Sequence, residues 1–362
     1  MPSLLYVFAK KKLRQRRMNI ASAFPTEQTK TVKSAKEWVS TLAKFREPNP
    51  ARSNFELLIT AVPFLALWAA AWVSLSVSYW LTLALSVPIS MFLLRLFTIQ
   101  HDCGHGSLFK NRTASDWVGR VLGVVTLTPY DVWRRTHAIH HSSHGNLEKR
   151  GIGDIVTLTV AEYQALSPLW KLQYRAYRNP FFLFGFVPAY LFFIQQRFPV
   201  GLTKTPKYWV SAMLTNLALL AVLGTIYYFG GWAPILLIFV PSTLLAATAG
   251  MWLFYVQHQF EETTWDHDEN WDLHDAALYG SSHYILPSWL NWFSANIAIH
   301  HVHHLYARIP FYRLPEVLRE NAELGEINRM TIRESLASVR MHLWDEDGKR
   351  LLSFRQARAL TA

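Results

Sequence analysis

Cysteine is almost missing from this 362-residue sequence, in which Cys103 is the only one. An intramolecular disulfide is therefore excluded, and a reducing compartment is compatible with the chain. Acidic residues are also few, 25 against 36 lysines and arginines, which gives a formal net charge of +11. Because 51% of the residues are hydrophobic, this excess indicates contact with an anionic membrane surface. No basic module interleaved with aromatic residues accompanies the charge, which argues against a nucleic-acid partner.

The N-terminus lacks the order of a secretory signal. Its short apolar stretch, residues 4–8, precedes the basic run at residues 10–17, whereas a signal peptide begins with its positive charges. We interpret the basic run as a cytosolic segment that lies against a membrane. A solvated tail is the alternative interpretation.

Long apolar runs are what the sequence has in abundance, at residues 55–75, 79–97, 208–229 and 233–256. Each run is long enough to cross a hydrocarbon core of roughly 30 Å at about 1.5 Å per residue. The links within the first pair and within the second pair are so short that the runs must form two antiparallel hairpins. The sequence therefore predicts an all-α membrane protein with four transmembrane helices.

A further apolar and aromatic segment spans residues 180–198, but Pro188 interrupts it and Gln195, Gln196 and Arg197 lie near its end. We predict an interfacial or re-entrant helix there, with a fifth span as the alternative. The expected organisation is a cytosolic N-terminal segment at 1–53, a membrane domain at 54–320 and a cytosolic C-terminal segment at 321–362.

Histidine is concentrated in three tight clusters, all outside the four apolar runs, which hold ten of the fifteen histidines. The clusters are His101 with His105; His137, His140 and His141 with His144 just beyond; and His300, His301, His303 and His304.

The spacing within the clusters suits metal binding. Residues three and four positions apart share a face of a helix, and neutral imidazole is a ligand for iron, copper, nickel and zinc. The clusters offer two, three and three imidazoles on common faces: His101 and His105; His137, His140 and His141; His300, His303 and His304. Eight nitrogens are too many for one ion and suit two ions with four or five ligands each. Scattered surface histidines are the alternative.

Four spans place all three clusters on one side of the membrane. The basic run at residues 10–17 puts the N-terminus in the cytosol by the positive-inside rule. Two crossings then return the chain to the cytosol before His101, and two more do so before His258. A fifth span would separate the first two clusters from the third.

Several other residues are candidates around the metals. His258, where the fourth run ends, is a candidate further ligand, with an interfacial histidine as the alternative. Metal-bound imidazoles usually donate their second N–H to a carboxylate, amide or carbonyl. Asp102, Asp154 and Asn296 are candidates for that acceptor, or else are solvated or capping residues. His301 and His144 are candidates for a supporting or substrate-facing role. The role of His283 is left open, and we expect His267, His274 and His342 to be ordinary surface residues.

The three clusters resemble the three histidine boxes of the membrane-bound fatty-acid desaturases. The stretches 127–141 and 145–154 are similar to the bacterial and cyanobacterial acyl-lipid desaturases, of delta-12 or delta-5 type, and the likeness covers roughly residues 50–320. One departure is the third box, which has four histidines instead of three, so the ligand role is carried to His300, His303 and His304.

The resemblance implies the chemistry and the fold. It implies a non-haem centre of two iron ions, held by the eight box histidines with His258 as a ninth ligand. A four-helix membrane bundle would lie under a cytosolic helical cap, in the bacterial inner membrane, with both termini cytosolic. The enzyme would use dioxygen to introduce a cis double bond into an acyl chain, with lipid-bound chains favoured. Trp133, Trp289 and Trp292 could line the acyl pocket or anchor the protein at the membrane interface.

The resemblance also implies a separate electron donor. Ferredoxin is the expected donor and cytochrome b5 the less favoured one, because the chain contains no haem-binding cytochrome b5 motif. Two other functions stay open at this point. A hydroxylase of alkanes or carotenoids would use the same metals, and a membrane metal transporter is a more remote alternative.

Overall fold

The computed structural model describes residues 33–360, so the basic run at residues 10–17 lies outside the described residues. Within them, four helices are long and apolar enough to cross a membrane. They are α3 (Pro50–Ser74), α4 (Tyr79–His105), α10 (Pro206–Gly230) and the continuous run Trp232–His258. This run comprises α11 (Trp232–Pro234), η4 (Ile235–Phe239) and α12 (Val240–His258). The prediction of four membrane-spanning helices is confirmed.

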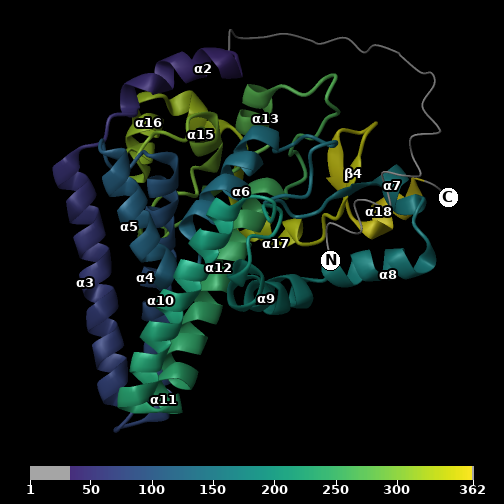
Figure 1. The fold of residues 1–362 in the computed structure, drawn as a ribbon. Helices are drawn as coiled ribbons and strands as arrows, with labels where there is room; N and C mark the ends of the chain where they lie inside the picture. Colours follow the sequence, from purple (N-terminus) through teal and green to yellow (C-terminus); the bar gives the residue numbers. More distant parts are fainter. Residues whose placement is uncertain (1–32, 361–362) are drawn as a thin grey trace.

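Short turns pair these helices as two hairpins (Figure 1). Ser78 begins α4 by accepting a hydrogen bond from the Leu81 amide, and the hydroxyls of Ser74 and Thr82 bond across the turn at 2.8 Å. Gly231, with φ +63°, separates α10 from α11, a backbone conformation that glycine adopts readily. The hairpins therefore form where the sequence places small and polar residues.

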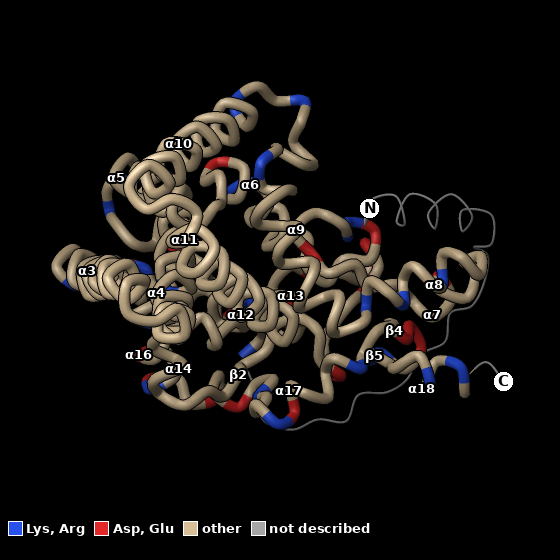
Figure 2. Tube along the Cα trace, turned by 90° about the horizontal axis from the view of Figure 1, so that it is seen from below, with Lys and Arg blue, Asp and Glu red and all other residues tan. Residues whose placement is uncertain are grey.

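The outer faces of the bundle are apolar and exposed. Leu214, Leu217 and Leu220 on α10 are each more than 60% exposed, which a water-soluble protein would avoid over so large an area. Figure 2 shows α10, α11 and α12 with almost no charged residues, whereas lysine, arginine, aspartate and glutamate mark the cap elements and the loops. The chain is a membrane protein whose helices need a lipid environment.

Two of the four helices continue beyond the predicted spans. α4 runs to His105, eight residues past the apolar stretch, and ends at Gly106, which has φ +68° and accepts the left-handed conformation of a helix C-terminus. α12 runs to His258. These extensions carry the first histidine cluster and His258 into the cap.

The predicted helix at 180–198 consists of three short pieces. They are η2 (Phe182–Phe186), a π-helical turn, α9 (Val187–Phe193) and η3 (Gln195–Arg197), and they follow α8 (Pro168–Tyr177). Pro188 stands in the first turn of α9, directly after the π-helical turn of η2 and within a helical stretch that is unbroken over residues 180–193. In Figure 1, α9 lies beside α12, and α8 extends away from the bundle beneath the part of the cap that holds α7 (Val160–Gln164) and α18 (Phe354–Ala359). None of these pieces is among the membrane-spanning helices of the described chain, so the fifth span is not found.

The remaining elements build a cap at one end of the bundle (Figure 1). Its helices include α5 (Arg112–Val125) and α6 (Tyr130–Ser143), which follow α4, and α13 (Leu273–Tyr279), α14 (Ser288–Phe293) and α15 (His300–Leu305), which follow α12. The other helical pieces are α2 (Ala35–Leu42), η1 (Ala43–Phe45), α7 (Val160–Gln164), η5 (Phe311–Arg313), α16 (Leu314–Glu320), η6 (Ala322–Glu326), α17 (Ile332–Ser338) and α18 (Phe354–Ala359).

Two small sheets also belong to the cap, and the sequence analysis did not predict them. β1 (Leu158–Thr159) pairs in parallel with β4 (Leu343–Asp345), which pairs antiparallel with β5 (Arg350–Leu352). β2 (His283–Ile285) pairs in parallel with β3 (Arg329–Thr331). Strands of two or three residues are too short for an alternating pattern to be visible in the sequence. They attach part of the 321–362 segment to the cap; the predicted domain limits stay a prediction.

Candidate metal centre

Four helices, α4, α6, α12 and α15, bring the histidine clusters together. His101 and His105 lie one turn apart at the end of α4, and His137, His140 and His141 lie along α6. His300, His303 and His304 occupy α15, and His258 is the last residue of α12. All of these imidazoles therefore meet at the same end of the bundle, beneath the cap.

The nine imidazoles form two groups, and each group is tight enough for one ion. In the first group, the ligand atoms of His101, His105, His137, His141 and His303 all lie within 4.8 Å of one another. In the second group, the same holds for His140, His258, His300 and His304. Neighbouring residues on one helix diverge, so that His140 and His141 join different groups, as do His303 and His304. Five and four nitrogens match the expected ligands of two adjacent ions.

The distances between facing nitrogens fit a shared metal ion. In the first group, the Nε2 atom of His141 lies 3.0 Å from that of His137 and 3.2 Å from that of His303. In the second group, the Nε2 atom of His258 lies 3.2 Å from that of His140 and 3.0 Å from that of His300. With imidazole–metal bonds of about 2.1 Å, two ligands at a right angle are about 3.0 Å apart. The spacing is therefore that of ligands around an ion.

Several imidazole nitrogens at this site are buried without a hydrogen-bond partner among the described residues. They include Nε2 of His101, His105 and His304. A buried polar atom without a partner costs about 1–3 kcal/mol, so a cluster of such atoms calls for a ligand. Metal coordination satisfies all of these lone pairs at once.

Burial also keeps these side chains in the form that binds metal. Removal from water lowers the pKa of His137, His141, His300, His303 and His304 well below the ordinary value, and neighbouring imidazoles lower it further. Neutral imidazole has the free lone pair that a cation requires. The residues present therefore fit a pair of bound metal ions.

Comparison with known proteins identifies the chemistry. Residues 78–335, more than half of the chain, match the family model described as "Fatty acid desaturase". The chain belongs to the fatty acid desaturase family. Members of this family are oxidoreductases that desaturate fatty acyl chains, and this chain is such an enzyme.

Individual relatives agree with the family assignment. The chain is 46% identical to a "Fatty acid desaturase" of Bacillus subtilis (strain 168), over 91% of this chain and 93% of the relative. It is 29% identical to an "sn-1 oleoyl-lipid 12-desaturase" of Synechocystis, over 60% of this chain and 62% of the relative. An "sn-1 acyl-lipid omega-3 desaturase (ferredoxin)" of the same organism is 26% identical, over 60% and 61%. The predicted family resemblance is confirmed.

Two carboxylates of the desaturase lie against metal-site imidazoles. Asp154 Oδ1 is 2.6 Å from His140 Nδ1, and Asp102 Oδ1 is 3.2 Å from His101 Nδ1. The Phe311 amide donates to Asp102 Oδ2 at 2.7 Å and holds that carboxylate in place. Gly153, with φ +75°, precedes Asp154, and a Cβ there would lie 3.1 Å from that of His140. Both aspartates therefore sit where an acceptor for a ligand's second N–H is needed.

The side chain of Asn296 has a backbone carbonyl as its partner. Its side-chain amide donates to the Phe311 carbonyl at 3.3 Å instead of meeting an imidazole. Its backbone is left-handed, with φ +56°, a conformation that asparagine tolerates better than most residues. Asn296 therefore shapes the turn between α14 and α15, and its supporting role for a ligand stays a prediction.

The uncertain histidines separate into two kinds. His144 stands beside the second group, with its ring centroid 4.1 Å from that of His258, and its Nε2 donates to the Gly280 carbonyl at 2.8 Å. His301 lies outside both groups and donates to the Leu324 carbonyl at 2.8 Å. His283 contacts the Gly325 carbonyl through Nδ1 at 2.8 Å. His283 and His301 thus attach the third box to η6.

Two of the histidines expected on the surface have specific partners. His267 lies between Glu148 and Glu346, at 2.5 and 2.6 Å. The His342 ring stacks on Phe354 with centroids 4.4 Å apart, and burial lowers its pKa to about 3. The expectation of an ordinary surface residue is wrong for His342, because β4 draws it into the cap.

Sequence reasoning missed one buried arginine that supports the metal site. Arg178, at the end of α8, donates to Gln259 Oε1 at 2.9 Å, to the Met341 carbonyl at 2.7 Å and to the Val156 carbonyl at 3.2 Å. It thus joins the segment after Asp154 to the residue after His258. No spacing rule marks such a residue, because its partners are distant in sequence. A lone arginine in a helix predicts only a solvated side chain.

Proposed function

We propose that this desaturase introduces a cis double bond into a fatty acyl chain carried on a membrane lipid, with two iron ions and dioxygen. The observation that supports this most directly is the pair of adjacent imidazole groups, one of five and one of four. The reaction takes two hydrogens from neighbouring methylenes and, with two electrons and two protons, reduces dioxygen to two waters. Iron would supply the oxidising power that side chains lack for this step, whereas zinc has no redox chemistry.

The side chains would hold and shield the reacting centre. We assign the ligands as His101, His105, His137, His141 and His303 for one ion and His140, His258, His300 and His304 for the other. Asp154 and Asp102 would fix the orientation of His140 and His101 by accepting their second N–H. The burial of the second group would keep water away from the oxidised centre there, which protects the reaction from side products.

We infer the acyl carrier and the electron donor from the names of the relatives. The names of cyanobacterial relatives include "acyl-lipid", "oleoyl-lipid" and "ferredoxin", which supports a lipid-bound substrate and a ferredoxin donor. A donor comparison tests the second point. We expect reduced ferredoxin to support turnover at a rate well above that of cytochrome b5, and the reverse order would contradict the assignment.

We further propose that the cap and both termini face the cytosol at a bacterial inner membrane. The turns at the far end of the bundle, residues 75–78 and 230–232, carry no charge, whereas the cap carries Lys110, Arg112 and Arg120. Positive charge marks the cytosolic side. Because Cys103 is buried, cysteines introduced singly at Ser76 and Lys110 can be labelled with a membrane-impermeant maleimide. Labelling of intact spheroplasts at position 76 and not at 110 is the expected result, and the opposite pattern would contradict the orientation.

Expression in a host that lacks the activity tests the reaction itself. We expect a new unsaturated fatty acid, located by mass spectrometry, together with about two irons per purified chain. His137→Ala and His304→Ala should abolish the product while the protein still inserts in the membrane. His274→Ala is the matched control, because His274 belongs to neither imidazole group. A hydroxylated product that retains oxygen from dioxygen would replace desaturation with the hydroxylase alternative.

A further inference from the structure

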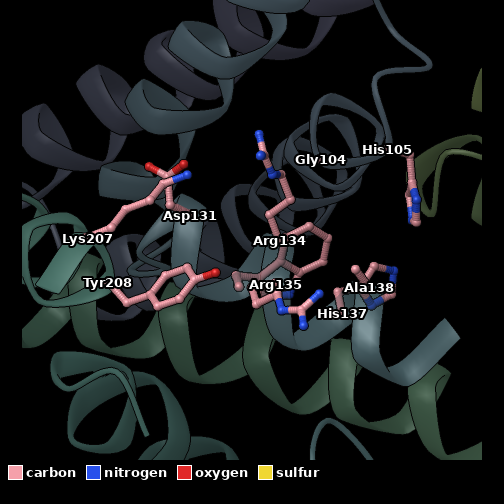
Figure 3. A pocket seen from close by; sticks show the side chains of 10 residues that line it. Gly104, His105, Asp131, Arg134, Arg135, His137, Ala138, Lys207 and Tyr208 are labelled. Atoms are coloured by element: carbon pink, nitrogen blue, oxygen red, sulfur yellow. The ribbon is translucent and has the colours of Figure 1, made fainter. Parts of the chain in front are cut away.

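A cavity of about 240 Å³ opens beside the first imidazole group. His105, His137 and Trp133 border it, and so do Arg135, Lys207 and Tyr208 (Figure 3). The Trp133 ring stacks on His137 with centroids 4.6 Å apart. One wall of the cavity therefore belongs to the metal site, and the other is formed by cationic and phenolic side chains.

The charges around this cavity are not balanced. Asp131 accepts bonds from Arg120 at 3.1 and 3.3 Å, and Arg134 pairs with Asp116 at 2.9 Å. Arg135 and Lys207, by contrast, are exposed and form no ion pair with any residue that the structure describes. The cavity, which Asp131 also borders, thus carries two cations that are free to contact an anionic ligand.

The position of the cations in the fold points to a membrane lipid. Lys207 and Tyr208 lie in the first turn of α10, one of the four membrane-spanning helices. In Figure 3 the hydroxyl of Tyr208 points toward the side chain of Arg135, which comes from α6. Basic and tyrosine side chains at the end of a span lie at the level of the lipid headgroups. The anion available at that level is a phosphate.

We infer that this cavity binds the phosphate of a phospholipid headgroup through Arg135, Lys207 and Tyr208. The inference rests on the proposed function and names the class of lipid that carries the acyl chain. At about 240 Å³, the cavity is smaller than the roughly 300–1,000 Å³ of sites that enclose a whole drug-sized ligand. Its size fits one small anionic group. Arginine and tyrosine would donate hydrogen bonds to the phosphate oxygens, and lysine would add a point charge.

The test uses the iron-loaded enzyme in vesicles with two lipids that carry identical acyl chains. One lipid is phosphatidylglycerol and the other is an uncharged glycosyl diacylglycerol without phosphate. We expect kcat/KM to favour the phospholipid by at least about tenfold, roughly what one charge-assisted hydrogen bond contributes. Arg135→Gln combined with Lys207→Gln should bring the ratio close to one. Lys204→Gln is the control, because Lys204 is an exposed lysine three residues away that does not border the cavity, and it should keep the ratio.

A binding measurement without turnover tests the phosphate site separately from the proposed desaturation. Short-chain phosphatidylglycerol should bind the wild-type enzyme and bind the double variant at least about tenfold more weakly, even if no product forms. Inorganic phosphate is titrated in parallel. If it binds the cavity equally well and the wild type shows no lipid preference, the ligand is free phosphate and the inference is overturned. Equal rates on both lipids, or an unchanged ratio in the double variant, would overturn it as well.

Discussion

At the scale of single residues, neighbouring histidines in one box have different surroundings. His300, His303 and His304 face the two imidazole groups, whereas His301 turns away and donates to the Leu324 carbonyl. His258 lies far from every box in sequence and still has its Nε2 within 3.2 Å of two other imidazoles. The contacts of each side chain, and not its membership of a cluster, therefore decide its role.

This contrast gives a first prediction. His258→Ala should remove one of four ligands of the second group, so the purified protein should hold about one iron in place of two and form no unsaturated product. His301→Ala should keep both irons and most of the activity, since His301 only attaches α15 to η6. Iron analysis and product analysis of the two variants, expressed side by side, provide the check. A full iron content in His258→Ala would exclude it from the ligands.

A second prediction concerns the carboxylate on His140. Asp154→Ala should lower metal affinity or activity by about 10- to 100-fold, the usual cost of losing an acceptor behind a metal-bound imidazole. Asp154→Asn should cost less, because its amide oxygen can still accept the bond. An iron titration of both variants measures the effect. Equal affinities in Asp154→Ala and the wild type would show that the 2.6 Å contact does not support the ligand.

At the scale of elements, the helices that carry the ligands are fixed by contacts between distant segments. Arg178 on α8 bonds to Gln259, just after α12, and to the carbonyls of Val156 and Met341. His267 joins the loop after the second box to the turn between β4 and β5, through Glu148 and Glu346. The C-terminal part of the chain is thus coupled to the second metal group.

The third prediction tests the arginine. Arg178→Met should lower stability by several kcal/mol, because each buried acceptor left without its donor costs about 1–3 kcal/mol. Arg178→Lys should recover part of it, because an ammonium reaches fewer of the acceptors. Thermal unfolding in detergent gives the stability, and iron content shows whether His258 keeps its place. A variant as stable as the wild type would contradict the role of this network.

The fourth prediction concerns pH. Burial lowers the pKa of His267, but its bonds to Glu346 and Glu148 outweigh that effect and raise the pKa above the ordinary value. The charged form is therefore favoured in the folded state. Its contribution is fully present below the unfolded pKa of about 6.5 and is lost as the pH rises through the folded value. Thermal unfolding across pH 6–9 should show this loss, and His267→Gln should reduce it.

At the scale of the whole molecule, the metal site lies between the membrane-spanning helices and the cap. The membrane helices α4 and α12 end in ligand histidines at one end of the bundle. The cap helices α6 and α15 hold the remaining ligand histidines at the same place (Figure 1). Nine imidazoles converge there, and burying so many inward lone pairs without a ligand costs free energy. Metal binding should therefore be coupled to the stability of the folded cap.

The fifth prediction follows from this coupling. Removal of iron with a chelator should lower the thermal unfolding temperature, because a ligand that binds only the folded state stabilises it. Readdition of Fe²⁺ should restore both the unfolding temperature and the activity. The control is His137→Ala combined with His304→Ala, which lacks ligands in both groups and should show no response to chelator. An unchanged unfolding temperature in the wild type would contradict the coupling.

Much of the fold and of the site could be predicted because the signals were local. The four spans depend on continuous apolar runs, and the boxes on histidines three and four residues apart. The short strands and the pieces of the interfacial segment could not be predicted. Their stability comes from contacts such as Thr248 with the Phe184 carbonyl at 2.9 Å, and both partners of such a contact are invisible to a local pattern.

The sequence alone determined that this chain enters a membrane, that it carries enough closely spaced imidazoles for two ions, and which family it resembles. These properties reside in composition and short spacing. Only the tertiary structure decided which imidazoles belong to which group, that the Asn296 amide bonds to the Phe311 carbonyl, and that Arg178 joins the C-terminal segment to the residue after His258. These outcomes depend on the direction of each side chain after packing, and packing joins residues that are far apart in the sequence.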